Sequence, residues 1–599
     1  MQRSRRRLSA LLISLLACAI VLSGLSPVEA QAAPGPQAAA PSASVSDVSA
    51  AHPRLLASST QIAGLAAQTG SDQPSADLRQ RILRNADAIL TAPAVSYASP
   101  EGGRALALSR TVLERSRTLT MAWELTADSR YLERLWSDVD AAASFPDWNP
   151  NHFLDVAEMS NALALAYDWG YSYWTDERRA TLREAILEKG LTAALPVYTA
   201  PKTSNGPYLY LGNWSTRSDN VNIVVNSSMI ISALAIAGDE PSSVVDDVLR
   251  FAVDSLRTGL AAYKADGGFV EGPTYWEYAS LYALSALTTL KASTGGDYGL
   301  SNSPGLRATS SLGLAVVGPS GAPYNFGDSD WSGDANAVFA GLGAVYRDRN
   351  LLTTASTAPT TYNATLQLAW RDLSIVGQGG TTIKPDLDST FSIGLTSSRT
   401  SRTDPLGTFV AFRSAGDPTA SHQQLDAGDF GLQALGEEWA VGLGKDEATY
   451  DVEGMSLDKR FAYYRSSMQG HNTLTIDPFQ VSTATTNTFS MLTRQSSPSQ
   501  SFTVSDLSGV FRKSVTSWQR GVKLTKATGR VVVQDELKSD GRHDVLWSMH
   551  TKADVRVAAD GRSAVLYQSG KRLLARIIST GGGQFSVAAA SQLPGAPVP

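Results

Sequence analysis

The 599-residue sequence has a single cysteine, Cys18, and only six histidines. One cysteine excludes a disulfide-stabilised scaffold and any zinc module built from several cysteines. Gly and Pro, at 49 and 27 residues, are too few for a collagenous or low-complexity chain, and the 43% hydrophobic content is too high for a disordered one. With 51 basic and 56 acidic residues, the chain also lacks the basic surplus of a nucleic-acid-binding protein.

Several signatures of catalytic chemistry are missing as well. The histidines never occur at the spacing of a helical metal-binding motif, and there is no glycine-rich phosphate loop. The sequence has no GxSxG elbow, and outside the N-terminal segment it has no cysteine nucleophile. These absences leave carboxylate, tyrosine, histidine and asparagine side chains as the candidates for catalysis.

The N-terminal segment has the pattern of a secretory signal peptide. Arginines crowd the first seven positions, an almost wholly apolar run fills residues 8–25, and small residues follow. We therefore expect residues 1–30 to be a signal peptide, with the twin-arginine route or a retained anchor as alternatives, and residues 31–52 to be an Ala/Pro/Ser-rich linker. Because Cys18 lies in the signal, the predicted secreted protein has no cysteine and a net charge of −8.

The period of the apolar residues divides the rest of the chain into two domains. Helical spacing over residues 53–380 predicts long helices joined by short turns, which suggests an α/α toroid. We expect helices at Asp77–Leu90, Arg104–Ala127, Leu154–Asp168, Glu177–Gly190, Asn222–Ala237, Ser243–Lys264 and Trp276–Lys291. Short β-branched runs over residues 381–599 predict an antiparallel β-sandwich. These runs include Ser389–Thr396, Gly407–Arg413, Glu438–Gly444, Asn472–Ile476, Gln500–Val504 and Lys523–Asp535.

Two polar clusters fall at the starts of predicted helices. The first runs from Asn213 to Asn222 and leads into a helix that also carries Asn226; Asn222 and Asn226 are one turn apart on one face. The second runs from Asp266 to Tyr278 and groups carboxylates with aromatic residues, as sugar clefts often do. Helix capping and aromatic packing explain the same residues without any catalytic role.

Two further clusters lie in the predicted β-domain. One is Ser421-His422-Gln423-Gln424-Leu425-Asp426, preceded by Arg413, and the other runs from Tyr463 to Leu474 through His471. A lone histidine is usually structural, so these clusters indicate chemistry only if the fold brings them together.

In chain order, these segments resemble the heparinase II/III-like family of polysaccharide lyases. The motifs that carry the resemblance are His52-Pro53-Arg54-Leu55-Leu56, Phe145-Pro146-Asp147-Trp148, Ala166-Tyr167-Asp168-Trp169, Asp266-Gly267-Gly268, Glu271-Gly272-Pro273-Thr274-Tyr275-Trp276, Tyr324-Asn325-Phe326-Gly327-Asp328, Tyr464-Arg465-Ser466 and His471-Asn472-Thr473-Leu474. The resemblance implies a toroid followed by a sandwich, and an enzyme that cleaves a uronate polysaccharide by β-elimination.

That reaction needs a neutral donor on the uronate carboxylate and groups that move protons at C5 and O4. The resemblance implies that Asn222 contacts the carboxylate, that Tyr275 is the acid/base and that His422 is the second proton-transfer group. Further substrate contacts implied in the same way are Asn220, Asn226, Trp214, Glu271, Trp276, Tyr278, Arg413, Tyr464 and Arg465. Asn220 and Asn226 are alternatives to Asn222, and Tyr278 is the alternative to Tyr275.

The sequence departs from the family where members commonly hold a structural zinc. Gln424 replaces a histidine, and Gly442 stands where an aspartate is typical. His471 and Asp426 remain, but a glutamine and one histidine make a poor zinc site. We therefore expect weak or absent zinc, with His471, Gln424 and Asp426 as the residues that any metal would use.

An acidic polysaccharide is the expected partner, with no nucleic acid and no membrane. Since the chain is acidic overall, such a substrate needs a local basic cleft, for which Arg217, Arg413, Lys459, Arg460 and Arg465 are candidates. Two other functions stay open. One is a non-catalytic glycan-binding homologue, and the other is a toroid glycoside hydrolase with paired carboxylates drawn from Glu271, Asp328 and Asp330.

Overall fold

The computed structural model describes residues 42–97, 104–201, 207–208, 212–330, 335–356, 363–414, 420–446, 450, 460–477, 489–511 and 514–591. The predicted signal peptide, the first half of the predicted linker (residues 31–41) and Lys459 lie outside these residues. Within them, no helix is both long enough and apolar enough to cross a membrane.

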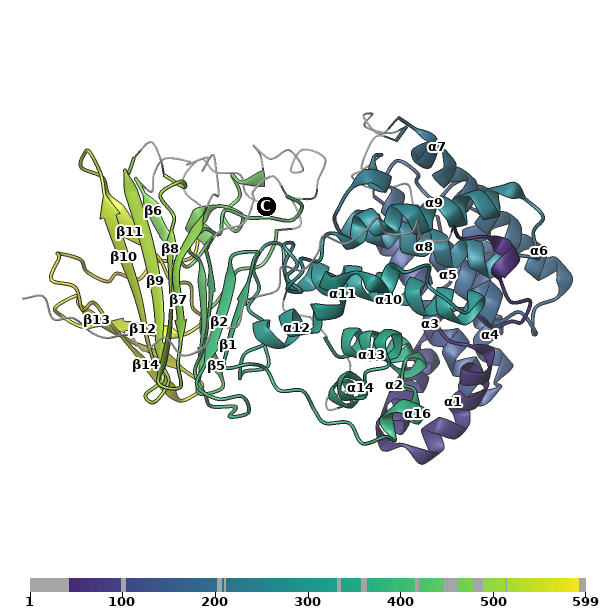
Figure 1. The fold of residues 1–599 in the computed structure, drawn as a ribbon, viewed down its shortest axis with the longest axis horizontal. Helices are drawn as coiled ribbons and strands as arrows, with labels where there is room; N and C mark the ends of the chain where they lie inside the picture. Colours follow the sequence, from purple (N-terminus) through teal and green to yellow (C-terminus); the bar gives the residue numbers. More distant parts are fainter. Residues whose placement is uncertain are drawn as a thin grey trace, which may run out of the picture. The chain divides into compact units, whose positions relative to one another are not determined.

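The first part of the described chain is helical (Figure 1). Its main helices are α1 (Ser59–Ser71), α2 (Gln73–Leu90), α3 (Leu106–Thr126), α4 (Ser129–Ser144), α5 (Phe153–Trp169), α6 (Asp176–Ala185), α7 (Ala193–Thr199), α8 (Asn220–Ile236), α9 (Ser243–Leu260), α10 (Pro273–Thr294), α11 (Pro304–Ala308), α12 (Ser310–Val316), α13 (Ala335–Tyr346), α14 (Arg349–Ala355), α15 (Ala364–Ala369) and α16 (Leu373–Val376). The expected helix at Glu177–Gly190 continues from α6 into a π-helical turn, Ile186–Thr192.

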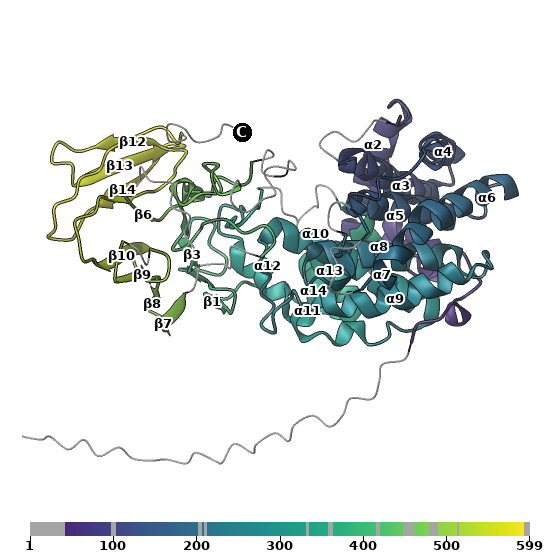
Figure 2. The ribbon, with the colours of Figure 1, turned by 90° about the horizontal axis from the view of Figure 1, so that it is seen from above.

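The helices pack as a closed ring (Figures 1 and 2). An inner series runs from α3 through α5, α8, α10 and α13 to α15, and α15 packs back against α2 and α3. Every residue of α5 and α8 is buried, so these two helices have no solvent-facing polar side, and the polar residues that they carry lie inside the protein. Outer helices such as α4 and α9 are amphipathic and bury one face only.

The second part consists of antiparallel sheets. Its strands are β1 (Asp388–Phe391), β2 (Leu395–Arg399), β3 (Phe409–Arg413), β4 (Phe430–Ala434), β5 (Glu437–Ala440), β6 (Leu474–Ile476), β7 (Ser490–Ser496), β8 (Gln500–Asp506), β9 (Ser517–Thr525), β10 (Arg530–Lys538), β11 (Val545–Trp547), β12 (Asp554–Val557), β13 (Ser563–Gln568) and β14 (Lys571–Arg576). The sheets have the orders β1-β2-β3-β4-β5, β10-β9-β8-β7, β11-β6 and β12-β13-β14. The predicted fold class, helices followed by antiparallel sheets, is confirmed.

Two predicted strands are each divided by a turn. Ser389–Thr396 contains the hairpin between β1 and β2, where Gly394 has a φ of +80°. Lys523–Asp535 contains the hairpin between β9 and β10, where Gly529 has a φ of +64°. A positive φ suits glycine, so each of these glycines marks a chain reversal that the apolar pattern alone concealed.

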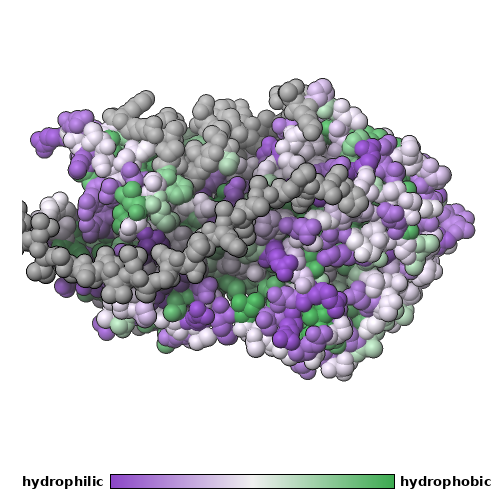
Figure 3. All heavy atoms as spheres, viewed as in Figure 1, coloured by the Kyte–Doolittle hydropathy of each residue, from purple (hydrophilic) through white to green (hydrophobic). Residues whose placement is uncertain are grey.

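Side-chain contacts join the helical and strand regions. Asp266 accepts a hydrogen bond from the Ser392 backbone at 2.5 Å, and the Tyr324 hydroxyl donates to Asp429 at 2.7 Å. The buried Arg399 of β2 donates to backbone carbonyls at the end of α12. These contacts fix the loops that carry the polar clusters. On the surface, hydrophilic and hydrophobic side chains are interspersed over the helical region (Figure 3).

Candidate active site

The loop that leads into α10 delivers Glu271 and Tyr275 to the strand region. Gly272 caps this helix with a φ of +91°, and a Cβ there would lie 2.2 Å from the Phe326 carbonyl oxygen. Only glycine fits that approach. Pro273 then starts the helix, where its missing N–H costs no hydrogen bond. The sequence Glu-Gly-Pro-Thr-Tyr therefore places Glu271 in the loop and Tyr275 on the first turn of α10.

Tyr275 and His422 meet face to face. Their ring centroids are 3.6 Å apart and their planes differ by 10°. His422 has a φ of +60°, a conformation that is costly for a residue with a side chain and that clusters at functional sites. The fold therefore brings together two of the three predicted catalytic residues, from opposite halves of the chain.

Asp328 is the centre of the hydrogen-bond network around His422. Its Oδ2 accepts from the Tyr450 hydroxyl at 2.7 Å and lies 3.2 Å from His422 Nδ1. Its Oδ1 accepts from Gln424 Nε2 at 2.9 Å and forms an ion pair with Arg460. Asp328 has no exposed surface, so these partners replace the water that a carboxylate would otherwise bind.

Tyr450 belongs to this cluster but was not among the residues predicted from the sequence. Its hydroxyl lies 2.9 Å from that of Tyr275 while it donates to Asp328, so the two phenols and the carboxylate form a chain of hydrogen bonds. Arg104 and Lys445 lie over its ring, 5.3 and 5.1 Å from the centroid. Tyr450 stands among charged residues in the sequence, and no motif marks it.

Asn220 and Glu271 form a second polar pair, beside the other edge of His422. Glu271 accepts hydrogen bonds from the backbone N–H of Asn220, at 3.0 Å, and from its side-chain amide. Glu271 Oε2 lies 3.8 Å from His422 Nε2. Asp219, the N-cap of α8, accepts from Arg217 at 2.6 Å and from Ser421 at 2.9 Å, which ties the start of α8 to the loop that carries His422.

The environment sets the protonation of these groups. Burial lowers the pKa of His422 even though Asp328 lies beside it, so its ring is neutral near pH 7. Burial alone would raise the pKa of Asp328, but the hydrogen bond to His422 and the charge of Arg460 hold that pKa well below its usual range.

The other two groups are held in their neutral forms. Burial and the charge of Asp219 raise the pKa of Glu271 well above its usual range. Burial and the charge of Asp328 raise the pKa of Tyr275. With Asp328 accepting the proton on Nδ1, His422 keeps its free lone pair on Nε2. The cluster thus holds one proton acceptor, His422 Nε2, and two neutral acids, Glu271 and Tyr275.

Asn222 and Asn226, two of the predicted carboxylate contacts, point away from this cluster into the helix bundle. The Asn222 amide donates to the carbonyls of Trp214 and Ser215 and to the Ser255 hydroxyl, at 3.1–3.2 Å. Asn226 donates to Asn222 and accepts from Tyr198 at 2.8 Å. Both side chains are fully buried. Of the three asparagines considered, only Asn220 is part of the cluster.

The predicted aromatic contacts on the helical side are also occupied within the protein. Trp214 has no exposed surface and packs on Phe153 with ring centroids 5.1 Å apart. Trp276 is buried and donates to Thr309 at 2.8 Å. The Tyr278 hydroxyl donates to the buried Glu158. In this conformation these three side chains stabilise the toroid.

The predicted substrate contacts in the β-domain differ in how far they are buried. Arg413 is completely buried and donates to the Ile393 carbonyl at 2.8 Å. The Tyr464 hydroxyl lies 2.9 Å from His550 Nε2. Arg465, by contrast, is 47% exposed and binds the carbonyls of Leu443 and Lys445. Arg465 is the most exposed of these three residues, and Tyr464 is partly buried.

The residues named from the sequence as candidate metal ligands do not fit a zinc site. Gln424 presents its amide N–H to Asp328 rather than an oxygen to a metal. At Gly442, a Cβ would lie 2.4 Å from Asn325 Oδ1 and 2.7 Å from the Asn325 carbonyl oxygen, so Asn325 fills the space that an aspartate side chain would need. Asp426 pairs with Arg413 at 3.3 Å.

His471, the remaining candidate ligand, is held in its neutral form by its surroundings. Burial and the neighbouring His550 lower its pKa to about 3, and its Nε2 has no hydrogen-bond partner among the described residues. Over the same part of the chain, no three His, Cys, Asp or Glu side chains are grouped as metal ligands.

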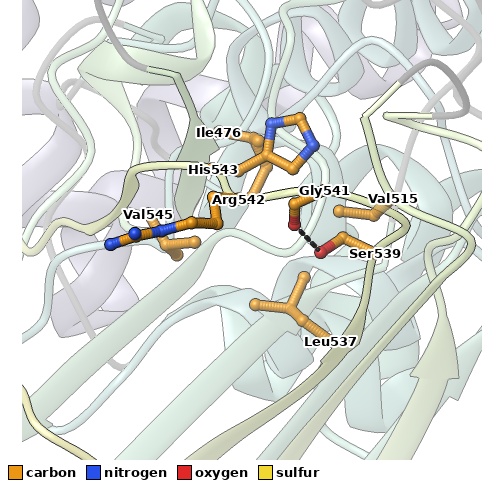
Figure 4. Close-up of a pocket in the computed structure, with 8 residues that line it drawn as sticks. All are labelled: Ile476, Val515, Leu537, Ser539, Gly541, Arg542, His543 and Val545. Carbon is orange, nitrogen blue, oxygen red and sulfur yellow. Dashed lines mark hydrogen bonds between the residues drawn. The ribbon is translucent and has the colours of Figure 1, made fainter.

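A hollow of about 240 Å³ at the far end of the sheets shares no residue with this cluster (Figure 4). It is lined by Ile476, Val515, Leu537, Ser539, Gly541, Arg542, His543 and Val545. Ser539 donates to the Gly541 carbonyl at 2.7 Å, and His543 lies 2.8 Å from Asp477. Arg542 is exposed beside them.

Residues 393–595 match the family model described as "Heparinase II/III-like, C-terminal". The C-terminal region is heparinase II/III-like. This match includes His422 and confirms the family resemblance predicted from the sequence. No curated protein sequence matches the chain.

Solved structures resemble this chain beyond the matched residues. Heparan sulfate lyase HepC from Pedobacter heparinus has a TM-score of 0.51 and 14% identity, over 78% of this chain and 69% of that one. A heparinase III with methylated lysines has a TM-score of 0.51 and 14% identity, over 76% and 67%. Chondroitin AC lyase from Streptomyces coelicolor A3 has a TM-score of 0.48 and 12% identity, over 84% and 71%. The first two share the fold of this chain, a helical toroid followed by antiparallel sheets.

Proposed function

We propose that this protein is a secreted polysaccharide lyase that cleaves a uronate-containing polysaccharide by β-elimination. The observation that carries the proposal is the stacked pair Tyr275 and His422, a neutral acid against a neutral base, in a chain whose C-terminal region is heparinase II/III-like. The fold shared with a heparan sulfate lyase supports the same reaction class.

The proposed reaction moves two protons. His422 Nε2 accepts the C5 proton of the uronate, because Asp328 accepts the hydrogen bond at Nδ1 and leaves Nε2 as the basic atom. The electron pair from the C5–H bond forms the C4=C5 double bond as the C4–O4 bond breaks. The Tyr275 hydroxyl then donates its proton to the departing O4, and the negative charge of Asp328, which raises the pKa of Tyr275, favours return of a proton to the phenolate that forms. The Tyr450 hydroxyl, 2.9 Å from that of Tyr275, is the neighbouring group that can donate to the phenolate oxygen.

Asn220 and Glu271 are proposed to bind the uronate carboxylate. Removal of the C5 proton places negative charge on that carboxylate, and neutral donors stabilise it better than charged carboxylates would. Asn220 is neutral, and burial with the charge of Asp219 holds the Glu271 carboxyl in its protonated form by raising its pKa. We therefore assign the carboxylate contact to Asn220 rather than to Asn222, which donates its amide protons within the helix bundle.

Cations around the cluster support an anionic substrate. Arg104 lies over the Tyr450 ring, and its Nε has no hydrogen-bond partner among the described residues. Arg217 is 28% exposed beside Ser421, and Arg465 is 47% exposed. A polyanion would bind to such a group of cations even though the net charge of the whole chain is negative.

The products distinguish elimination from hydrolysis. The purified protein is incubated with uronate polymers in water labelled with heavy oxygen, and the products are weighed by mass spectrometry. Elimination yields an unsaturated end that contains no oxygen from water. Products that are heavier by one labelled water would instead indicate a hydrolase that uses Glu271 or Asp328. Polymer binding without any product would indicate a glycan-binding homologue.

A further inference from the structure

We propose that Asp328, Gln424 and Arg460 form a metal-free network that positions His422, so that this lyase works without the structural zinc typical of its family. The inference rests on the proposed function for its kinetic consequences, but its metal-binding consequences are independent of turnover. Two observations carry it: the hydrogen bonds that converge on Asp328, and the way Asn325 fills the space beside Gly442.

Asp328 holds His422 at two points. Its carboxylate accepts from His422 Nδ1 at 3.2 Å, and its backbone N–H donates to the His422 carbonyl at 3.0 Å. At the preceding residue, Gly327, a Cβ would lie 2.8 Å from the same carbonyl oxygen. The loop that ends in Asp328 is thus pressed onto the backbone of His422. This double contact supports the positive φ of His422, which would otherwise relax.

Gln424 and Arg460 hold Asp328 in turn. Gln424 donates to Asp328 Oδ1 at 2.9 Å and to the Gly444 carbonyl at 3.3 Å, so its amide links the carboxylate to the segment after β5. Arg460 is 8% exposed and pairs with the same oxygen, which supplies the positive charge that a buried carboxylate needs. Together they supply a cation and a fixed donor where a metal ion would supply charge and geometry.

A zinc ion has no place in this arrangement. Gln424 turns its amide nitrogen to Asp328 and to the Gly444 carbonyl, and the amide oxygen that remains is not among the side-chain ligands that zinc ordinarily takes. An aspartate at position 442 would collide with Asn325, whose amide nitrogen lies 3.4 Å from the carbonyl oxygens of Ser329 and Gly442. The guanidinium of Arg460 would also repel a second cation at Asp328. Asn325 therefore occupies the space beside Gly442, and Arg460 supplies the positive charge at Asp328 that a metal ion would supply.

The first test measures metal binding by the full-length protein. The protein is dialysed against zinc and then against metal-free buffer, its zinc content is measured by plasma emission, and its melting temperature is compared with and without EDTA. We expect zinc far below one ion per chain and an unchanged melting temperature. One zinc per chain, with a melting temperature that falls in EDTA, would overturn the proposal whether or not the protein is a lyase.

The second test measures positioning through Arg460→Met and Gln424→Met. If the proposed function holds, Arg460→Met should lower kcat on the order of 100-fold with little change in KM, because a small displacement of the base is costly. Arg460→Lys should lose less, and added guanidinium ion should partly restore Arg460→Ala. The control is Arg494→Met, which removes a partly buried arginine 3.8 Å from Asp388 and should lower stability without lowering kcat.

An NMR measurement decides the same point without substrate. In protein labelled with ¹⁵N only at its six histidines, His422→Gln identifies the His422 signals. The proposal predicts a hydrogen-bonded proton on Nδ1 in the wild type and its loss in Arg460→Met and Gln424→Met, but not in Arg494→Met. Unchanged His422 signals in both variants, with both folded, would contradict the positioning role. Failure to form an unsaturated product would contradict the proposed function alone.

Discussion

The phenol of Tyr275 lies flat against the imidazole of His422, with ring centroids 3.6 Å apart. One residue stands on the first turn of a toroid helix and the other in a loop before β4, so the pair exists only when the two regions fold together. The hydroxyl of Tyr275 bonds to Tyr450, and His422 bonds to Asp328. This contact between the two rings underlies the proposed proton transfers.

Tyr275→Phe should remove activity and leave the fold intact. The hydroxyl is the proposed acid, so its loss should lower kcat by about 10²- to 10⁴-fold. The phenyl ring can still stack on His422, and Tyr450 still donates to Asp328, so the melting temperature should change little. Steady-state kinetics and calorimetry measure the two effects. Tyr346→Phe is the control, because it removes a hydroxyl whose hydrogen-bond partner among the described residues is the Ser301 carbonyl, at 3.0 Å.

Asn220→Ala should lower activity, whereas Asn222→Ala should lower stability. Asn220 is part of the catalytic cluster, so its loss should lower kcat by about 10²- to 10³-fold, as removal of one donor to a developing oxyanion does. The Asn222 amide nitrogen has three hydrogen-bond acceptors around it within the bundle, so its loss should lower the free energy of unfolding by about 1–3 kcal/mol. If Asn222→Ala abolished activity at full stability, the carboxylate contact would belong to Asn222.

The sequence predicted the residue types of the site better than their roles. Glu271, Tyr275 and His422 were identifiable because a glycine-proline helix start and a histidine beside turn residues resemble family motifs. The family resemblance implied Asn222 as the carboxylate contact, but neither a resemblance nor spacing along a helix says which face meets the site. The N-cap Asp219 orients α8 so that Asn220 faces Glu271 and Asn222 faces Ser255.

The rest of the site could not be predicted because it depends on tertiary contacts. Tyr450 joins the cluster through a hydrogen bond to a residue in the other half of the chain, and no local pattern marks such a contact. The fold class was predictable because helical and strand periods differ over long stretches. Short hairpins were missed where one glycine reverses the chain, as Gly529 does between β9 and β10.

Gly272→Ala should destabilise the protein and displace the catalytic loop. Its φ of +91° and the close Phe326 carbonyl both disfavour a side chain. Gly295→Ala is the matched control, because Gly295 has a φ of +78° and no other group lies within 4 Å of where its Cβ would be. Gly295→Ala should cost about 1–2 kcal/mol for its backbone conformation. Gly272→Ala should cost roughly 1–3 kcal/mol more because of the overlap, as measured by denaturant unfolding. Equal losses in the two variants would contradict the close approach.

The free energy of unfolding of the toroid should decrease as the pH rises from mildly acidic to neutral, because of Glu124. Burial, together with the charge of Asp168, raises the pKa of Glu124 from 4.5 to about 7. In this range the folded protein holds a proton that the unfolded chain has released, so rising pH favours unfolding.

Glu124→Gln removes this proton linkage, which gives a direct comparison. The variant should be more stable than the wild type above pH 7, and the difference should shrink toward pH 4.5. Chemical unfolding at several pH values measures it, with Glu188→Gln, an exposed glutamate of the same region, as the control. A constant difference across this range would show that Glu124 does not carry the linkage.

The central claim, that this protein eliminates rather than hydrolyses, is tested most directly by ultraviolet absorbance. The purified wild-type protein is mixed separately with alginate, heparan-type, chondroitin-type and hyaluronan-type polymers and with a microbial uronate exopolysaccharide. The C4=C5 double bond conjugated to the carboxylate absorbs, whereas the substrate and the products of hydrolysis do not. We predict a steady rise in absorbance with at least one polymer and no rise with Tyr275→Phe. Folded wild-type protein that produces no absorbance with any of these polymers would contradict the account.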